Sequence, residues 1–550
     1  MDLHFTGARE TPEERSAVDA AVGGEKRRDL LLPALHAIND RVGWISEGAL
    51  DYVCRRLEVP PAEAFGVASF YHMFSLKQRP PELVYACDDI ACRLKGAEKL
   101  CARLGDRVKR SPCLGQCERA PAALVLVAGK SPKAYTVAPF SGATAEPKEN
   151  LRASVPQSGS PDLRLIHRIG TVDPESLEGY RSSGGYSGLR RAIELGPKSV
   201  IAEVTASKLV GRGGAAFPTG RKWEAVAAAT AKPHYLVCNA DESEPGTFKD
   251  RLLMEGDPFA VVEGMTIGGY ATGCERGYLY VRGEYPLAAR RMSRAIEAAR
   301  TAGLLGAFDI EIRRGAGAYI CGEETALFNS IEGRRGEPRN KPPFPVQVGL
   351  FGNPTVVNNV ETLVNVPLIL REGGASYQGG PKLFCVSGHV ARPGLYEIPF
   401  GTTLRRLVEI AGGRKPQAVL LGGAAGSFVG PDQLDTPLTF EGTRAIGATL
   451  GSGVVMVMDD TVDLGDILTR IAAFFRDESC GQCVPCRVGT VRQEELLRRL
   501  RSGNPLGSRK QELALLKEIG QAMRDASICG LGQTASSAIE SAVARWRIGG

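Results

Sequence analysis

The sequence Gly211-Arg-Gly-Gly-Ala-Ala-Phe-Pro-Thr-Gly-Arg-Lys-Trp223 opens the stretch that decides the fold, and Asn239-Ala-Asp-Glu-Ser-Glu-Pro-Gly246 closes it. Between them the apolar run Tyr235-Leu-Val-Cys238 predicts a buried strand. Loop, helix, strand and second loop, in this order, place both loops at one end of a parallel sheet. The stretch therefore predicts an α/β domain with a ligand site at that edge.

The residue types of these two loops are suited to a nucleotide. Glycines let backbone N–H groups approach a phosphate, and cations add positive charge. These residues are Gly211, Gly213, Gly214, Arg212, Arg221 and Lys222. The acceptors of the second loop suit ribose, ribityl or amide groups; they are Asn239, Asp241, Glu242 and Glu244. Taken alone, the first loop could equally be an ordinary glycine-rich surface loop.

Composition excludes several classes of protein. The 550 residues are 43% apolar and 24% charged, which is typical of a globular chain of several domains. A net charge of +6 without a long basic run argues against nucleic acid as a partner. Neither a membrane span nor a secretion signal is evident, so we expect a cytoplasmic protein. Its 14 cysteines then predict metal ligation rather than disulfides.

Changes of pattern along the chain predict seven segments. A polar tail, a helical bundle and a small α/β domain are followed by a Ser/Gly/Pro-rich linker. A large α/β domain, a compact α+β domain and a helical region complete the chain. In order, the segments are 1–28, 29–80, 81–140, 141–161, 162–378, 379–460 and 461–550.

Two sets of cysteines carry the strongest chemical signal. In the small α/β domain, the pairs Cys87/Cys92 and Cys113/Cys117 each follow a predicted strand, which suits a [2Fe–2S] cluster. In the helical region, Cys-x2-Cys-x2-Cys and a distant fourth cysteine suit a [4Fe–4S] cluster; the four are Cys480, Cys483, Cys486 and Cys529. Zinc is the alternative for both sets, although its usual ligand pairs are spaced differently.

A nucleotide pocket and two clusters in one chain predict electron transfer through a flavin. Pyridine nucleotides exchange two electrons as hydride and clusters exchange one at a time, whereas a flavin can do both. Further loops could complete such a pocket: 322–324, 340–345 and 357–362. In the last of these, Asn358 and Asn359 could grip a polar ring or simply cap the helix that follows.

Several of these motifs together resemble one known family. Segments 211–223, 239–251, 317–324, 341–344 and 357–362, with the four late cysteines, are similar to the NADH-binding FMN subunit of respiratory complex I. Residues 28–140 resemble that complex's smaller [2Fe–2S] subunit, fused here in one chain. The fusion, Ser182-Ser-Gly-Gly-Tyr186 and Glu323-Glu-Thr325 look most like the beta subunit of NAD-dependent molybdenum or tungsten formate dehydrogenase. NAD-reducing hydrogenases use the same module.

The resemblance implies a fold and a role for each matching residue. The fold is a helical bundle with a thioredoxin-like domain, a Rossmann-like FMN and NADH domain, an SLBB-like α+β domain and a helical [4Fe–4S] domain. FMN would be held by Gly211, Arg212, Gly213, Gly214, Lys222, Asn239, Asp241, Glu242, Tyr319, Gly322, Glu323, Val357, Asn358, Asn359 and Thr362. NADH would contact Phe217, Phe344, Glu244, Glu324 and Lys341. Glu242 and Glu324 are the candidate catalytic side chains.

The resemblance also implies that the chain is half of an enzyme. Hydride would pass between NAD(H) and FMN, and single electrons between the clusters and a catalytic alpha subunit, most simply one that oxidises formate. Hydrogen or quinone chemistry in the partner is the alternative. The sequence departs from the family at Ala216, where a glycine is common, and at Ala225, where an aromatic residue often stands. A weaker or altered grip on the adenine is expected from these two changes.

Overall fold

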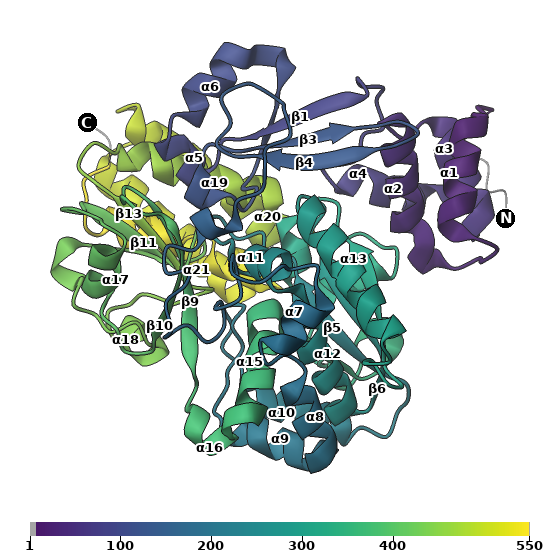
Figure 1. Ribbon diagram of the computed structural model, residues 1–550. Helices are drawn as coiled ribbons and strands as arrows, with labels where there is room; N and C mark the ends of the chain where they lie inside the picture. Colours follow the sequence, from purple (N-terminus) through teal and green to yellow (C-terminus); the bar gives the residue numbers. More distant parts are fainter. Residues whose placement is uncertain (1–6, 549–550) are drawn as a thin grey trace.

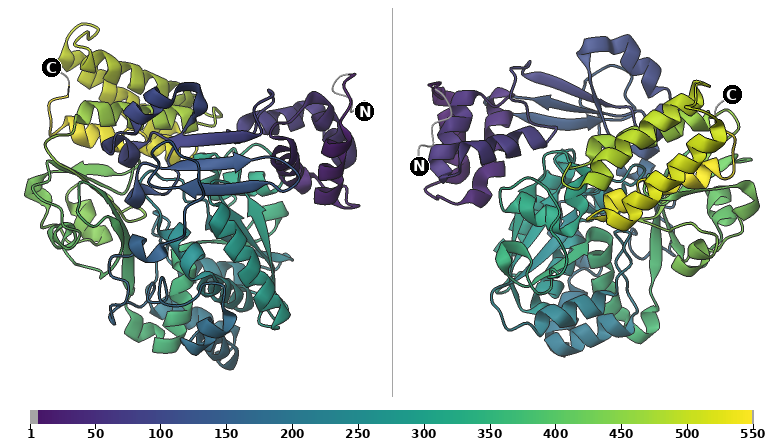
Figure 2. Two further views of the ribbon diagram at one scale, coloured as in Figure 1. Left: turned by 45° about the horizontal axis from the view of Figure 1, so that its top comes forward. Right: turned by 180° about the vertical axis from the view of Figure 1, so that it is seen from behind.

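The computed structural model describes residues 7–548 (Figure 1). One cluster of buried apolar side chains runs from Val18 in the first helix to Ile548 near the C-terminus. The helical bundle and the small α/β domain lie above the large α/β domain in Figure 1, and the two C-terminal regions lie beside both (Figure 2). The domains therefore share a core, so the sites between them are fixed by packing.

Four helices form the N-terminal bundle: α1 (Pro12–Val22), α2 (Leu31–Val42), α3 (Glu47–Leu57) and α4 (Pro61–Phe70). The first of these corrects the prediction of a tail over residues 1–28. Thr11 and Glu14 form a reciprocal capping box at the start of α1, and Val18 and Val22 are buried against α2. Residues 1–6 of the predicted tail lie outside the described residues. The many charged residues of this segment concealed the apolar spacing of α1, so the sequence did not predict this short amphipathic helix.

The small α/β domain is one four-stranded sheet in the order β2-β1-β3-β4. Its strands are β1 (Glu82–Cys87), β2 (Lys109–Ser111), β3 (Ala123–Val127) and β4 (Lys133–Val137). Helices α5 (Ile90–Leu94) and α6 (Ala97–Leu104) connect β1 to β2, which run parallel. The sequence did not predict β4, because its five residues lack a clear apolar run. The two cysteine pairs follow β1 and β2 as expected.

The predicted linker over residues 141–161 is only partly a linker. A 3₁₀ turn at Leu151–Ser154 docks on the rest of the protein, and Ser154 and Val155 are buried. Ser154 Oγ donates to Glu118 Oε1 at 2.8 Å, and Gln157 pairs with the backbone of Glu397. This segment therefore connects the small α/β domain to strand β10 (Gly394–Pro399) of the α+β module, which contains Glu397.

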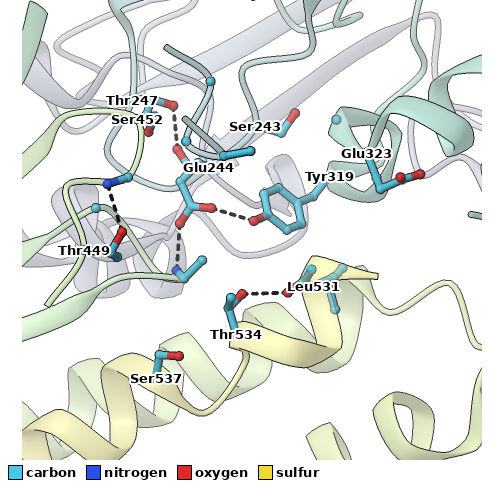
Figure 3. Close-up of a pocket in the computed structure, with 18 of the residues that line it drawn as sticks. Ser243, Glu244, Thr247, Tyr319, Glu323, Thr449, Ser452, Leu531, Thr534 and Ser537 are labelled. Carbon is cyan, nitrogen blue, oxygen red and sulfur yellow. Dashed lines mark hydrogen bonds between the residues drawn. The ribbon is translucent and has the colours of Figure 1, made fainter. Parts of the chain in front are cut away.

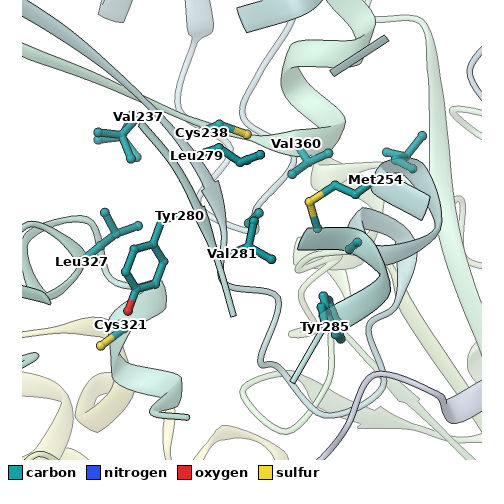
Figure 4. Packing of buried hydrophobic residues seen from close by; sticks show 14 of the residues in the cluster. Val237, Cys238, Met254, Leu279, Tyr280, Val281, Tyr285, Cys321, Leu327 and Val360 are labelled. Atoms are coloured by element: carbon teal, nitrogen blue, oxygen red, sulfur yellow. The ribbon is translucent and has the colours of Figure 1, made fainter. Parts of the chain in front are cut away.

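The large α/β domain has a fully parallel sheet in the order β7-β6-β5-β8. Its strands are β5 (His234–Ala240), β6 (Cys274–Val281), β7 (Asp309–Arg314) and β8 (Thr355–Asn359). The helices are α7 (Leu177–Ser182), α8 (Ser187–Leu195), α9 (Pro197–Ala206), α10 (Thr219–Ala227), α11 (Lys249–Gly256), α12 (Pro258–Thr272), α13 (Pro286–Thr301), α14 (Glu324–Ile331), α15 (Val360–Glu372) and α16 (Gly374–Tyr377). Figure 4 shows the two faces of the sheet: Leu279 and Val281 of β6 lie toward Met254 of α11 and Val360 of α15, whereas Val237 of β5 lies on the opposite side, with Leu327 of α14. Both loops of the opening stretch flank β5.

The α+β module that follows is a five-stranded sheet in the order β10-β9-β13-β11-β12. Its strands are β9 (Pro381–Gly388), β10 (Gly394–Pro399), β11 (Ala418–Leu421), β12 (Ser427–Val429) and β13 (Val454–Met458). Helices α17 (Leu404–Ile410) and α18 (Phe440–Ala445) complete it. The three residues of β12 were too short a run to predict.

The C-terminal region is helical: α19 (Leu464–Glu478), α20 (Val484–Arg501), α21 (Arg509–Ala526), α22 (Gly530–Thr534) and α23 (Ser537–Val543). Three of the late cysteines lie between α19 and the first turn of α20, and the fourth is the residue before α22. Among the described residues, no helix combines the length and apolar character needed to cross a membrane.

Candidate functional site

A cavity of about 790 Å³ opens where the parallel sheet, the α+β module and the C-terminal helices meet (Figure 3). The large α/β domain supplies many of its walls. Ten residues expected from the sequence line it: Gly213, Gly214, Asn239, Asp241, Glu242, Glu244, Tyr319, Gly322, Glu323 and Asn359. Its position past the carboxyl ends of parallel strands is the usual place for a ligand in such a sheet.

The glycine-rich loop gives the cavity a backbone wall. Gly214 has φ +117°, which L side chains rarely adopt, and a Cβ at Gly213 would lie 3.3 Å from Asn359 Cβ. Gly211 and Ala216 do not line the cavity. Ala216 has φ +52°, a strained conformation for alanine, which explains why glycine suits this position.

Arg212 does not point to the cavity, contrary to the expectation of a phosphate contact. Its backbone N–H donates to Thr362 Oγ1 at 2.9 Å, while its guanidinium donates to the carbonyl of Gly379. The guanidinium also lies over the ring of Phe400, 4.6 Å from the centroid. Arg212 and Thr362 are thus buried residues that hold the glycine-rich loop against α15 and the α+β module.

The acidic loop presents one buried carboxyl oxygen to the cavity. Asp241 Oδ2 has no hydrogen-bond partner among the described residues, and burial raises the pKa of this carboxyl well above its usual value. Asn239 is held by its Nδ2, which donates to the carbonyl of Gly322 at 2.8 Å. A buried acceptor without a donor is costly, so hydroxyl or N–H groups of a ligand would satisfy it. This buried acceptor, beside the backbone of the glycine-rich loop, fits a flavin mononucleotide, which offers hydroxyl and N–H groups.

Glu242, a candidate catalytic residue, uses its carboxylate to hold the fold. Its two oxygens accept the backbone N–H groups of Asp250 and Arg251, each at 2.9 Å, and the hydroxyl of Tyr285 at 3.1 Å. Burial and the nearby charge of Asp250 raise its pKa to about 7. Glu242 therefore caps the first turn of α11, so its carboxylate oxygens are engaged by the fold.

Glu244 bridges the large α/β domain and the α+β module across the cavity (Figure 3). The Tyr319 hydroxyl donates to Oε2 at 2.6 Å, and the Ala425 backbone N–H donates to Oε1 at 2.9 Å. Burial raises the pKa of Glu244 to about 7. Its contacts place it at the cavity wall rather than at the outer rim.

Four further expected residues form what we call the outer rim, beside the cavity: Phe217, Phe344, Glu324 and Lys341. Phe217 and Phe344 are 49% and 52% exposed, which is unusual for such large apolar rings. Lys341 pairs with Glu323 at 2.8 Å and with Glu324 at 2.9 Å. Although burial opposes ionisation, Lys222 and Lys341 keep the pKa of Glu324 below its usual value. The rim offers flat apolar faces around a cluster of opposite charges.

Three more expected residues, Lys222, Asn358 and Asn359, make contacts that support the loops around the cavity. Lys222 Nζ lies 3.4 Å from the carbonyl of Val357 and 3.6 Å from Glu324. Asn358 Oδ1 accepts the indole N–H of Trp223 at 2.9 Å, and Asn359 caps α15 by accepting from the N–H of Glu361. The helix-cap alternative is therefore confirmed for Asn359, which also lines the cavity.

The first cysteine set is enclosed. Cys113 Sγ lies 3.4 Å from Cys117 Sγ, and hydrogen bonding with Cys113 and Cys92 raises the pKa of Cys87. All four thiols are buried, and Asp89 Oδ2 accepts the backbone N–H of Cys113 at 3.1 Å. Four buried thiols that meet in loops at one end of a sheet fit a [2Fe–2S] cluster.

The second cysteine set lies nearer the surface. Cys480, Cys483, Cys486 and Cys529 line one small cavity, and three of them are partly exposed. Burial raises the pKa of Cys529 to about 12, against the effect of two backbone N–H groups, from Leu531 and Gly532. Over the described residues, no three His, Cys, Asp or Glu side chains converge on a single metal ion. Cluster ligands instead surround an inorganic core of several irons.

Comparison with known proteins matches four sequence families to successive parts of the chain. Residues 19–130 match the thioredoxin-like [2Fe-2S] ferredoxin family, and residues 204–368 match the Nuo51 FMN-binding domain. Residues 383–424 match the SLBB domain, and residues 466–548 match the NADH-ubiquinone oxidoreductase-F iron-sulfur binding region. The second F-type subunit of NADH-quinone oxidoreductase in Rhizobium meliloti (strain 1021) is 45% identical over 404 residues, which are 70% of this chain and 95% of the relative.

The chain belongs to the family of F-type subunits of NADH-quinone oxidoreductase. Another relative is the NADP-reducing hydrogenase subunit HndC of Solidesulfovibrio fructosivorans, 44% identical over 69% of this chain and 81% of its own length. A chain in the crystal structure of an air-oxidised NAD+-reducing [NiFe]-hydrogenase is also similar, at 32% identity. It has a TM-score of 0.80 and covers 95% of this chain and 93% of its own length. The predicted fold class and the predicted cofactors FMN, NADH, [2Fe–2S] and [4Fe–4S] are confirmed.

Members of this family are NADH oxidoreductases, so this chain is the NADH-binding, flavin-carrying part of an enzyme. Its structure adds cavity residues that sequence reasoning missed. They include Lys249, Asp250, Ala425, Thr449, Ser452, Thr534 and Ser537. Most come from the α+β module and the C-terminal helices, far from the two loops in sequence. Only tertiary packing brings these residues to the cavity. The glycines within residues 447–453 were a weak sequence signal of a second loop close to a ligand.

Proposed function

We propose that this chain is a diaphorase subunit that exchanges electrons between NAD(H) at the outer rim and a partner subunit near the second cysteine set. Bound FMN supplies the exchange of a hydride with NAD(H) and of single electrons with clusters. The chain's own part is to bind, to orient and to exclude water. No protein acid or base is needed at the transferred hydrogen.

One observation carries the proposal: the flavin cavity adjoins both cysteine sets. Ile320 and Leu531 line the flavin cavity and also the cavity of the second set. On the other side, the guanidinium of Arg282 donates to the carbonyl of Glu242 at 2.7 Å and to that of Cys113 at 2.8 Å. A nucleotide pocket beside both cysteine sets would let a bound flavin pass single electrons to a cluster at either set.

The roles of individual residues follow from their placement. FMN would be held by the cavity-lining residues Gly213, Gly214, Asn239, Asp241, Tyr319, Gly322, Glu323 and Asn359, with Ser452 and Lys249 added. Gly211, Arg212, Val357, Asn358 and Thr362 would support the loops from behind, and Glu242 would orient them. The first cysteine set would bind the [2Fe–2S] cluster, and the second set would bind the [4Fe–4S] cluster.

NAD(H) would bind at the rim. Phe217 and Phe344 offer exposed faces on which an adenine can stack, and Lys341 offers positive charge for a phosphate. Glu324 would accept from ribose hydroxyls, and its low pKa keeps it ionised at neutral pH. Glu324 is thus a binding residue in this proposal, and the exposed rim lets NAD(H) come and go.

The proposed partner is a formate-oxidising alpha subunit that contains molybdenum or tungsten. Support comes from the fusion of the two cofactor regions in one chain and from residues 182–186 and 323–325. A hydrogenase partner is the second candidate, favoured by the likeness, over nearly the whole chain, to a chain of an NAD+-reducing [NiFe]-hydrogenase structure. Isolation of the intact complex followed by metal analysis separates them: molybdenum or tungsten supports formate, and nickel supports hydrogen.

The diaphorase proposal itself is tested on the isolated chain. We expect anaerobically purified protein to be yellow-brown, to release FMN on acid precipitation and to reduce ferricyanide with NADH. It should not oxidise formate or hydrogen without a partner. Formate turnover by the chain alone, or protein without flavin and acid-labile sulfide, would contradict the proposal.

A further inference from the structure

Arg282 is a buried cation between the cysteine loop that contains Cys113 and the acidic loop of residues 239–246. It follows β6 and is only 3% exposed. Its Nη2 donates to the carbonyl of Cys113 at 2.8 Å and to Glu284 Oε1 at 2.9 Å, and its Nη1 donates to the carbonyl of Glu242 at 2.7 Å. The guanidinium thus touches the first cysteine set and the acidic loop of the flavin cavity at once.

Packing holds this guanidinium in place. The ring of Tyr285 lies 4.9 Å below it, and the Tyr285 hydroxyl donates to Glu242 Oε2. A Cβ at Gly115 would lie 2.0 Å from the Tyr285 hydroxyl, so the cysteine loop can approach only because residue 115 is glycine. A second arginine, Arg251, donates from Nε to the carbonyl of Gly115 at 2.7 Å. Because the backbone N–H of Arg251 also donates to Glu242, both arginines connect the cysteine loop to the acidic loop.

Several titratable groups lie near Arg282, among them Asp241, Glu478 and His72 as well as Glu284. Glu284 is its counter-ion, and nearby positive charge keeps the pKa of Glu284 below its usual value despite burial. Arg282 Nε has no hydrogen-bond partner among the described residues, which leaves one buried donor of the fork unused. Reduction of a cluster adds a negative charge, and charge nearby in a dry interior acts strongly on its potential.

We propose that Arg282 is a positioning residue that sets the reduction potential of the first cluster and ties its loop to the flavin loop. Glu284 acts in the opposite sense, by offsetting part of the guanidinium charge. The inference rests on the assignment of Cys113 as a [2Fe–2S] ligand in the proposed function. Arg282 acts through the cysteine loop and the acidic loop, and it is not a catalytic residue.

The test is a redox titration of the full-length protein, monitored by the electron paramagnetic resonance signal of the reduced [2Fe–2S] cluster. We expect Arg282→Gln to lower the one-electron reduction constant at least tenfold, which equals about 59 mV toward negative potential. Arg282→Lys, which keeps the charge, should recover most of that shift. Glu284→Gln should move the potential in the positive direction, because it leaves the guanidinium uncompensated.

A matched control removes a buried arginine elsewhere in the same domain. Arg168 pairs with Asp257 at 2.8 Å and contacts neither loop, so Arg168→Gln should leave the potential unchanged. If Arg282→Gln fails to fold, Glu284→Gln still decides the matter by the sign of its shift. Potentials of all variants equal to wild type, or a negative shift in Glu284→Gln, would overturn the inference. Absence of any [2Fe–2S] signal in wild-type protein would instead overturn the proposed function.

Discussion

The two cysteine sets differ in how they meet solvent. The thiols of the first set are buried between the small α/β domain and the large one, with charged side chains on both sides. The second set lies at the edge of the helical region, where Val484 and Val488 of α20 are 58% and 46% exposed. A cluster near the surface can pass electrons to another protein, whereas an enclosed one exchanges them only inside the chain. We therefore propose that the second set is the exit for electrons and the first an internal store.

The largest effect should come from removing a ligand of the exposed set. Cys483→Ala should reduce electron transfer from NADH to the partner subunit at least about 100-fold, the upper end of what loss of an outer-shell metal contact costs. Reduction of ferricyanide should persist in part, because the flavin cavity is intact. Stopped-flow measurement with the partner checks this. Cys54→Ala, which removes a buried thiol in α3, is the control, and an equal loss there would refute the assignment.

The enclosed set should depend on the ion pairs that cover it. Arg251 is buried and pairs with Glu118 at 2.6 Å and with Glu255 at 2.8 Å. Arg251→Gln leaves the buried carboxylates of Glu118 and Glu255 without their cation. This should lower the free energy of unfolding by about 3–5 kcal/mol. Urea unfolding followed by flavin fluorescence measures it. Arg191→Gln, which breaks an exposed pair with Glu194, should cost less than about 0.5 kcal/mol. Similar costs in both variants would contradict the enclosure of the first set.

Between the two sets, Glu244 should make stability depend on pH. Burial raises its pKa to about 7 in the folded chain, above the usual 4.5, so folding favours the protonated acid. Its contribution is complete below pH 4.5 and is lost as the pH rises through 7, which amounts to about 3 kcal/mol. Glu244→Gln should reduce the loss of stability over this pH range by that amount in flavin-free protein, while Glu242, whose pKa is also raised to about 7, keeps its own contribution. Parallel pH profiles for wild type and variant would show that the carboxyl is not enclosed.

Metal removal should distinguish the sets by rate. After mild oxidation, a chelator should strip iron from the exposed set about ten times faster than from the enclosed one, because enclosed thiols open only through larger unfolding. Separate electron paramagnetic resonance signals report each set. Loss of both signals at one rate would mean that the two environments are equivalent.

Local sequence patterns predicted strand β5, both cysteine sets and the two loops beside β5, but not strand β8 (Thr355–Asn359), whose last residues were interpreted as a ligand loop or helix cap. Spacing and periodicity fixed these features, because each depends on neighbours in the chain. Arg212 shows where that reasoning stops: a cation beside glycines suggested a phosphate, but the side chain turns toward Phe400 and the carbonyl of Gly379. The cavity walls formed by Thr449 and Ser537 depend on how distant domains pack. No local pattern encodes that packing.

The distribution of the cavity walls has a consequence for biosynthesis. Residues that line the flavin cavity extend from Gly213 to Ser541, close to the C-terminus. Because a ribosome releases the chain from its N-terminus onward, the pocket is completed only when the residues up to Ser541 have emerged. Loading of the prosthetic group is therefore a late step, and a premature stop anywhere before α23 yields a polypeptide whose pocket lacks part of its wall.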